Sequence, residues 1–200
     1  MSILHPWDSM TDERRAAFVA ATKDKIAISN ASLSDDGLYR YTLTRLWTPD
    51  DPALRTPSLA WVMLNPSTAD AKVNDATIRV CMGRARRLGY SGITVVNLYA
   101  FRATQPSTLW HAADPVGPLN DWSLRLTLDC AKAGDYGAVV CGWGDNAKAD
   151  RVSKVLAMFA VAGVIPYCLG TTKAGQPKHP LRISYETPLQ VLPVAAASAG

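Results

Sequence analysis

Residues 59–67 read Leu-Ala-Trp-Val-Met-Leu-Asn-Pro-Ser. The apolar part of this stretch, 59–64, is short and continuous, which is typical of a strand that other elements cover on both faces. The run Ile-Thr-Val-Val-Asn-Leu at 93–98 has the same character, and shorter apolar runs occur at 138–141 and 164–169. We therefore predict four buried strands, each followed by a segment that contains polar residues, glycine or proline.

Helical patterns separate the predicted strands. Asn74 or Asp75 can cap a helix that Gly89 ends, and two further amphipathic segments occur at 119–133 and 145–162. Such an alternation of strand and helix favours a parallel sheet with helices on both faces. The predicted fold class is therefore α/β, a three-layer sandwich around a central, mainly parallel four-stranded sheet.

A different pattern precedes the first of these strands. Residues 11–23 predict a short helix, and residues 25–29 and 38–47 predict a β-hairpin in which Arg40 and Thr42 alternate with apolar residues on a half-exposed strand. A chain of 200 residues fits one domain. The boundaries that we predict are 1–57 for the N-terminal helix and hairpin, 58–192 for the α/β core and 193–200 for a frayed tail.

The composition is that of an ordinary globular domain, with 48% hydrophobic residues and a net charge of +4 from 21 basic and 17 acidic residues. A chain of this length can bury roughly 70% of its unfolded surface, so its stability requires no metal or disulfide. The N-terminus lacks a signal-peptide pattern, and no apolar run is long enough for a membrane span. The four cysteines are widely spaced. We expect a cytoplasmic protein with no cofactor, no metal and no membrane partner. The sequence leaves the oligomeric state open and favours a monomer.

Ligands of open α/β sheets bind outside the carboxyl ends of the strands. At these ends the predicted strands place Asn65, Asn97, Trp143 and, in the last loop, His179. An Asn carboxamide can pair bidentately with the edge of a base, and an aromatic ring can stack on its face. A His can donate a hydrogen bond to an oxygen that gains negative charge. Together these residues predict a site for a planar heterocycle.

Each of these residues also has a purely structural interpretation. An Asn after a strand often caps a turn or a helix, Trp143 can pack in the core, and His179 can lie in a surface loop. The basic residues have two interpretations as well, because cations near the C-terminus of a helix interact favourably with its dipole. As contacts to a nucleic-acid backbone we predict Arg79, Arg86, Arg87, Lys173 and Lys178.

The segments at the strand ends resemble, in the same order, motifs of the uracil-DNA glycosylase superfamily. Residues 61–67 resemble the Gly-x-Asn-Pro-Gly motif of its mismatch-specific members, and residues 93–98 resemble the strand whose last Asn binds the uracil edge. Residues 140–147 resemble its segment Leu-Trp-Gly-x-x-Ala, and residues 179–181 resemble a shortened His-Pro-Ser-Pro-Leu loop.

The chain between Tyr39 and Leu181 resembles another family more closely, an uncharacterised bacterial and phage family known as domain of unknown function 1643. This resemblance rests on four segments, which are residues 63–69, 77–79, 97–102 and 179–181.

The glycosylase resemblance implies a uracil-DNA-glycosylase-like fold and a role for several residues. Asn65 would position the attacking water, Asn97 would read the base, and His179 would stabilise the charge that develops on the base carbonyl. Leu181 would lie near the loop that fills the gap left by a flipped nucleotide. Further substrate contacts are expected from Pro66, Ser67, Tyr99, Phe101, Arg102 and Trp143.

The chain departs from the glycosylase pattern in the first motif. Met63 and Ser67 stand where the family has glycines, and no Asp occupies the position of Asn65 to act as a strong general base. Asp70 and Asp75 follow closely, and either carboxylate could be that base or could cap the next helix. We place Asp70 with Asn65 and His179 among the expected catalytic residues.

Three functions are compatible with these observations. The first is a nucleobase-acting enzyme that hydrolyses an N-glycosidic bond in damaged or modified DNA or in a nucleotide. The second is a nucleic-acid or nucleotide-binding module without catalytic activity, and the third is a nucleotide-processing enzyme of a phage or DNA-modification pathway. In each case the expected partner is a nucleic acid or a nucleotide.

Overall fold

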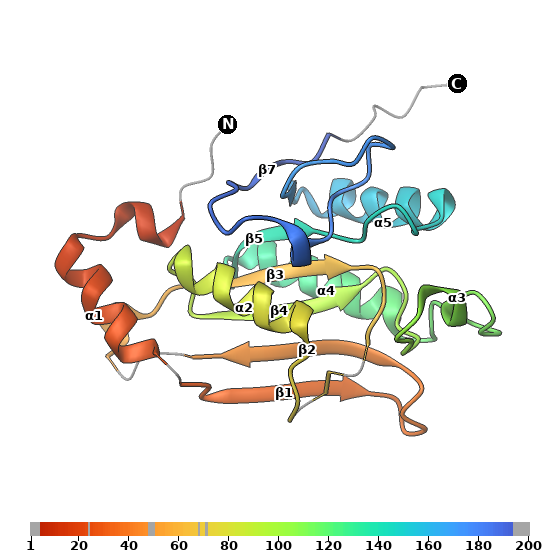
Figure 1. Cartoon of the computed structure of the whole chain (residues 1–200), viewed down its shortest axis with the longest axis horizontal. Coiled ribbons are helices and arrows are strands. Elements are labelled where there is room, and N and C mark those ends of the chain that lie inside the picture. Colours follow the sequence, from red (N-terminus) through yellow and green to blue (C-terminus); the bar gives the residue numbers. More distant parts are fainter. Residues whose placement is uncertain (1–4, 24, 48–50, 68, 71, 194–200) are drawn as a thin grey trace.

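A single mixed sheet runs through the computed structural model in the order β1-β2-β4-β3-β5-β6-β7 (Figure 1). The structure describes residues 5–23, 25–47, 51–67, 69–70 and 72–193. The strands in these segments are β1 (Ile28–Leu33), β2 (Arg40–Leu46), β3 (Ser58–Met63), β4 (Gly92–Asn97), β5 (Tyr136–Cys141), β6 (Pro166–Cys168) and β7 (Gln190–Val191). The helices are α1 (Asp12–Thr22), α2 (Ala76–Arg87), α3 (Pro106–Leu109), α4 (Asn120–Ala133) and α5 (Ala149–Ala162), with 3-10 turns η1 (Pro6–Ser9), η2 (Pro52–Leu54) and η3 (Pro180–Arg182).

The middle of the sheet is parallel. β3 pairs with β4 on one side and with β5 on the other, and β5 pairs with β6, all in the parallel direction. These strands coincide with the apolar runs that predicted them, although β6 is shorter than its run at 164–169. The α/β class is therefore confirmed.

The predicted strand number is wrong, because the sheet has seven strands within the described residues rather than four. β2 pairs antiparallel with β4 and carries β1 at its outer edge, while β7 pairs antiparallel with β6. The hairpin joins the sheet because Tyr41 and Leu43 of β2 are buried and because β2 satisfies the backbone groups along the edge of β4. β7 is too short to show a strand period in the sequence.

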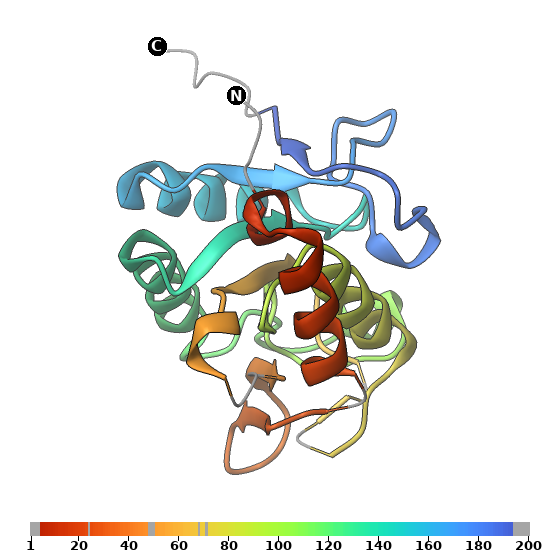
Figure 2. The same ribbon diagram turned by 90° about the vertical axis from the view of Figure 1, so that its left-hand side faces the viewer.

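Helices cover both faces of the sheet (Figure 2). On one face Trp61 of β3 belongs to a core with Phe18 of α1 and Ile78 of α2. On the other face Val62 belongs to a core with residues of α4 and α5, such as Val155. Successive residues of β3 therefore face opposite cores, as expected of a strand that is buried on both sides.

Two helix starts shape the end of the sheet where the parallel strands finish. Asp75 caps α2, its Oδ1 accepting from the backbone N–H of Ile78 at 2.8 Å. The helix predicted at 145–162 begins only at Ala149, since Gly144 adopts a left-handed conformation (φ +70) and the chain forms a loop before the helix. None of the described helices is long and apolar enough to cross a membrane. Residues 194–200 of the predicted frayed tail lie outside the described residues.

Candidate functional site

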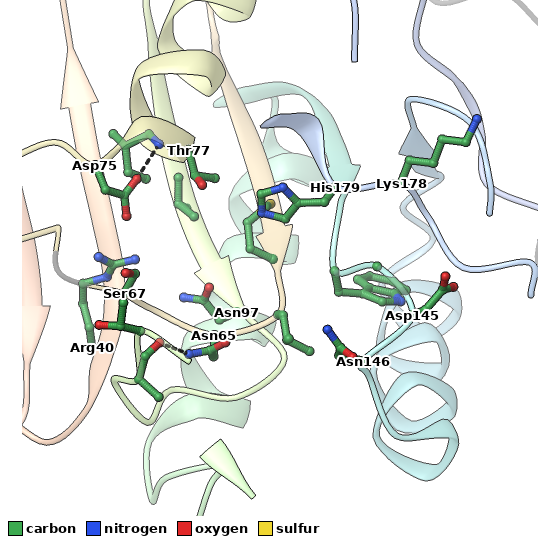
Figure 3. A pocket seen from close by; sticks show the side chains of 18 of the residues that line it. Arg40, Asn65, Ser67, Asp75, Thr77, Asn97, Asp145, Asn146, Lys178 and His179 are labelled. Atoms are coloured by element: carbon green, nitrogen blue, oxygen red, sulfur yellow. Dashed lines mark hydrogen bonds between the residues drawn. The ribbon is translucent and has the colours of Figure 1, made fainter. Parts of the chain in front are cut away.

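A cavity of about 570 Å³ opens at the carboxyl ends of β3, β4 and β5. The chain passes from β3 through α2 to β4 on one side of β3, and then returns past β3 to β5 on its other side. The direction of winding thus reverses at β3, and a crevice at such a reversal is the usual ligand site of an open α/β sheet. The N-terminus of α2 and the loop that ends at His179 complete the walls (Figure 3).

Asn97 is the last residue of β4 and lines the cavity. Its side chain is 1% exposed, yet neither its Nδ2 nor its Oδ1 has a hydrogen-bond partner within the described part of the chain. Buried carboxamides in proteins are nearly always paired, because an unsatisfied polar group costs about 1–3 kcal/mol. Asn97 therefore presents a complete donor and acceptor pair to whatever occupies the cavity.

Asn65, two residues after the end of β3, lines the same cavity. Its Nδ2 donates to the carbonyl oxygens of Pro66 (3.0 Å) and Ala103 (2.8 Å), which ties the end of β3 to the loop after β4. Both amide hydrogens are thereby used. The Oδ1 of Asn65 stays available as a hydrogen-bond acceptor.

His179 stands at the rim of the cavity and is partly open to solvent. Its Nδ1 accepts from the backbone N–H of Leu181 at 3.3 Å, so the proton of the neutral ring lies on Nε2. Burial lowers the pKa of His179, and the negative charge of Asp75 opposes this shift. The side chain is therefore a neutral N–H donor near pH 7.

Trp143 follows β5 and forms an aromatic part of the cavity wall. The indole Nε1 donates to Oε1 of Gln176 at 2.8 Å, and the backbone N–H of Gly144 donates to the carbonyl oxygen of Pro177 at 2.9 Å. These bonds attach the segment after β5 to the loop that carries His179. The position of the ring is therefore set by two segments that are distant in the sequence.

The polar residues that line the cavity without having been predicted as site residues include Arg40, Asp145 and Asn146. Arg40, at the start of β2, is 2% exposed and lines the cavity, although its strand pattern predicted a half-exposed position. A register shift between β1 and β2 places Arg40 opposite Leu33 and removes it from the simple alternation. Asp145 and Asn146 line the cavity because α5 starts after them.

Of the two carboxylates that follow Asn65 in the sequence, Asp75 lines the cavity and Asp70 does not. Asp75 lines it while capping α2, and its charge raises the pKa values of both Arg40 and His179 against the effect of burial. Oδ1 of Asp70 accepts from the backbone N–H groups of Lys72 (2.7 Å) and Val73 (2.9 Å), and these bonds hold the pKa of Asp70 low. Asp70 thus stabilises a turn outside the cavity. The sequence alone is compatible with a role as general base or as helix cap for each of the two carboxylates.

The structure brings Asn65, Ser67, Asn97, Trp143, Lys178 and His179 to one cavity. Other expected substrate contacts lie beside it. The ring of Tyr99 packs edge-on against that of Trp110, with 5.1 Å between the ring centroids, and the ring of Phe101 packs against that of Tyr39, with 5.9 Å between the centroids. Nη1 of Arg102 donates to the carbonyl oxygen of Gly37. The expected site residues that do not line the cavity are Pro66, Asp70, Arg79, Arg86, Arg87, Tyr99, Phe101, Arg102, Lys173 and Leu181.

The arginines of α2 have partners within the protein. Arg79 donates to the carbonyl oxygen of Asn74 at 2.6 Å, Arg86 lies over the ring of Trp47 at 4.3 Å, and Arg87 pairs with Glu186 at 3.0 Å. These contacts agree with the structural interpretation of the arginine cluster, and the predicted contacts to a nucleic-acid backbone stay a prediction.

Arg84 of the same helix is 1% exposed and has four hydrogen-bond acceptors among the described residues. Its guanidinium donates to the backbone carbonyl oxygens of Ile183, Ser184, Tyr185 and Thr187, between 2.7 and 3.3 Å. Arg84 therefore holds the segment that follows His179 against α2, which connects the helix to the position of the rim.

A family model described as "Protein of unknown function (DUF1643)" matches residues 40–181. The matched region begins at Arg40, extends beyond His179 and so includes the whole lining of the cavity except Ile183. No curated protein and no solved structure matches the chain.

Proposed function

The chain belongs to the family of proteins of unknown function DUF1643, and we propose from its cavity that it is a nucleobase-acting enzyme that hydrolyses an N-glycosidic bond. The observation that carries this proposal is the carboxamide of Asn97, which is buried, lines the cavity and has no hydrogen-bond partner among the described residues. A carboxamide of this kind suits a ring edge that presents an acceptor beside a donor, as nucleobases do.

The size and the walls of the cavity support a nucleobase. Its volume of about 570 Å³ lies within the usual range of about 300–1,000 Å³ for small-ligand sites. Trp143 supplies an aromatic surface on which a base can stack. Hydrogen bonds to Asn97 would then fix the orientation of the base within the plane of its own ring. The order of the strand-end segments supports a glycosylase-type core as part of the same proposal.

Asn65 and His179, two neutral polar residues that line the cavity, suit a hydrolytic reaction. A water bound to Oδ1 of Asn65 attacks the anomeric carbon, the C–N bond breaks, and its electron pair passes to the base. Nε2–H of His179 donates to the base carbonyl oxygen as negative charge develops there. The proton released by the water passes to Asp75 and then to the base, so that sugar and free base are the products.

Release of free base, measured by chromatography, tests this function. The panel consists of nucleosides, nucleoside 5′-monophosphates, and single- and double-stranded oligonucleotides that carry uracil, a mismatch or a modified base. We expect release from at least one member, and loss of at least about 100-fold in rate for Asn65→Ala, as for other single groups that act in the transition state.

Asp75→Asn and Asp70→Asn form a matched pair, because they change the same chemical group inside and outside the cavity. Asp75→Asn is expected to abolish release and Asp70→Asn to retain most of it. If no panel member releases base from correctly folded protein, the enzyme proposal is wrong. Nucleotide binding that disappears in Asn97→Leu would then favour the binding module instead.

A further inference from the structure

Arg40, like Asn97, is a buried residue that lines the cavity and has a side-chain polar atom without a partner among the described residues. Arg40 is 2% exposed, its Nη1 donates to the carbonyl oxygen of Ala69, and its Nε has no partner within the described residues. Figure 3 shows its guanidinium on the side of the cavity formed by Ser67 and Asp75, across from His179 and Asn146. Removing part of a guanidinium from water without a partner is unfavourable, so this position calls for an explanation.

The charge of Arg40 is not neutralised by a direct ion pair. Among the described residues no carboxylate lies within 4.0 Å of its guanidinium. Asp75 acts on it from a longer distance, and its carboxylate already accepts the capping bond from Ile78. Burial lowers the pKa of Arg40 to about 10, which leaves the side chain protonated at neutral pH. The cavity thus holds a buried cation with unused hydrogen-bonding capacity.

The neighbouring side chains extend this feature. The hydroxyl groups of Ser67 and Thr77 line the same side of the cavity as Arg40, and both can donate hydrogen bonds. A guanidinium flanked by hydroxyl donors matches a phosphate group better than a carbonyl or an amine, because phosphate offers several charged acceptor oxygens.

We propose that Arg40, with Ser67 and Thr77, forms an anion subsite that binds the terminal phosphate of a free mononucleotide while its base pairs with Asn97. This inference rests on the proposed function and specifies its substrate class. Two features favour a terminal phosphate over the backbone of a polymer. Arg40 is 2% exposed and lines the cavity instead of an open surface, and the arginines Arg79, Arg86 and Arg87 of α2 make contacts within the protein.

The test compares matched ligands by calorimetry. Nucleosides of each common base are titrated beside the corresponding nucleoside 5′-monophosphates, together with orthophosphate and a single-stranded oligonucleotide. The monophosphate of the preferred base is expected to bind at least about tenfold more tightly than its nucleoside, a factor that corresponds to about 1.4 kcal/mol. Orthophosphate is expected to compete with the monophosphate but not with the nucleoside.

Variants identify the subsite. Arg40→Met is expected to remove the preference for the monophosphate and to leave nucleoside affinity unchanged, while Arg40→Lys retains part of the preference. Arg45→Met is the matched control, since Arg45 is a buried arginine of the same strand that does not line the cavity. Its guanidinium donates to the side chain of Asn74 and to backbone carbonyl oxygens. Arg125→Gln, on α4, provides a second control if Arg45→Met does not fold.

The outcomes separate this inference from the proposed function. Equal affinity for nucleoside and monophosphate, with binding lost in Asn97→Leu, overturns the anion subsite and leaves base recognition intact. Phosphate-dependent binding that needs Arg40 but ignores both the base and Asn97 supports the subsite and overturns the nucleobase proposal. Tighter, Arg40-dependent binding of the oligonucleotide shows that the phosphate belongs to a strand and overturns the free mononucleotide.

Discussion

Asn120, the first residue of α4, holds the end of β4 through its side chain, because its Nδ2 donates to the backbone carbonyl oxygens of Asn97 (3.1 Å) and Leu98 (2.8 Å). The carboxamide of Asn97 itself has no partner in the described residues. Two buried asparagines in contact thus have opposite functions. One uses its amide hydrogens to fix the backbone, and the other is held in place with its polar atoms directed at the cavity.

This difference predicts opposite effects on stability. Asn97→Leu removes an unpaired buried amide and is expected to leave the free energy of unfolding unchanged or to raise it by about 1 kcal/mol. Asn120→Leu removes two hydrogen bonds, although the carbonyl oxygen of Leu98 keeps its bond from Nε of Arg151 (2.7 Å), and is expected to lower it by about 1–2 kcal/mol. Urea denaturation measures both. Equal destabilisation by the two substitutions would show that the Asn97 amide has a structural partner.

Arg84→Met tests the attachment of the rim segment to α2. The substitution leaves four backbone carbonyls without their donor, so we expect a loss of about 2 kcal/mol or more in the free energy of unfolding. Amide hydrogen exchange in the variant is expected to accelerate at residues 183–187 under conditions in which exchange in β3 is still unchanged. Arg79→Met, an exposed position of the same helix, is the control and is expected to change stability by less than about 0.5 kcal/mol. Unchanged exchange at 183–187 in Arg84→Met would contradict the assigned role.

The titration of His179 predicts a pH dependence with a definite sign. Burial lowers its pKa in the folded protein below the ordinary value of 6.5. As the pH falls through 6.5, the unfolded chain therefore binds a proton that the folded protein resists, and the free energy of unfolding decreases. Above this range the folded state has its full stability. Base release is expected to fall only at lower pH, where His179 of the folded protein is itself protonated, because the protonated ring loses the bond from Leu181 to Nδ1.

Unfolding at pH 8 and pH 5, compared between the natural protein and His179→Gln, measures this contribution. His5, whose pKa burial also lowers, is present in both proteins and cancels in the comparison. The natural protein is expected to lose more stability on acidification than the variant. A larger loss in the variant would mean that the pKa of His179 is raised, and would contradict the assigned tautomer.

The contact between Trp143 and Gln176 predicts a spectroscopic signal. Gln176→Leu leaves the buried indole N–H without its acceptor, which is expected to lower the free energy of unfolding by about 1 kcal/mol. Nucleoside binding is expected to alter tryptophan fluorescence in the natural protein, and Trp143→Phe to remove that change while preserving a stacking surface. A fluorescence change that persists in Trp143→Phe would place the bound base elsewhere.

The sequence by itself determined the parallel core and the residues at its strand ends. The apolar runs around Trp61 and Val95 are long enough to identify strands that are buried on both faces, and the polar residues that follow each run mark the end of the strand. Because the carboxyl ends of parallel strands meet at one edge, Asn65 and Asn97 could be placed together before any contact was known. The cap at Asp75 is equally local, since it depends only on the first turn of α2.

Only the tertiary structure decided which residues complete the cavity. Arg40 enters it through a register shift in a hairpin that pairs with β4, and Arg84 finds its acceptors about 100 positions later in the chain. Neither residue stands in a periodic pattern that reveals its partner. Periodicity reports which face of an element is buried, whereas the partners of a buried charge depend on how distant segments pack. For that reason the position of Asn97 at the cavity could be predicted from the sequence, and that of Arg40, the proposed phosphate ligand, could not.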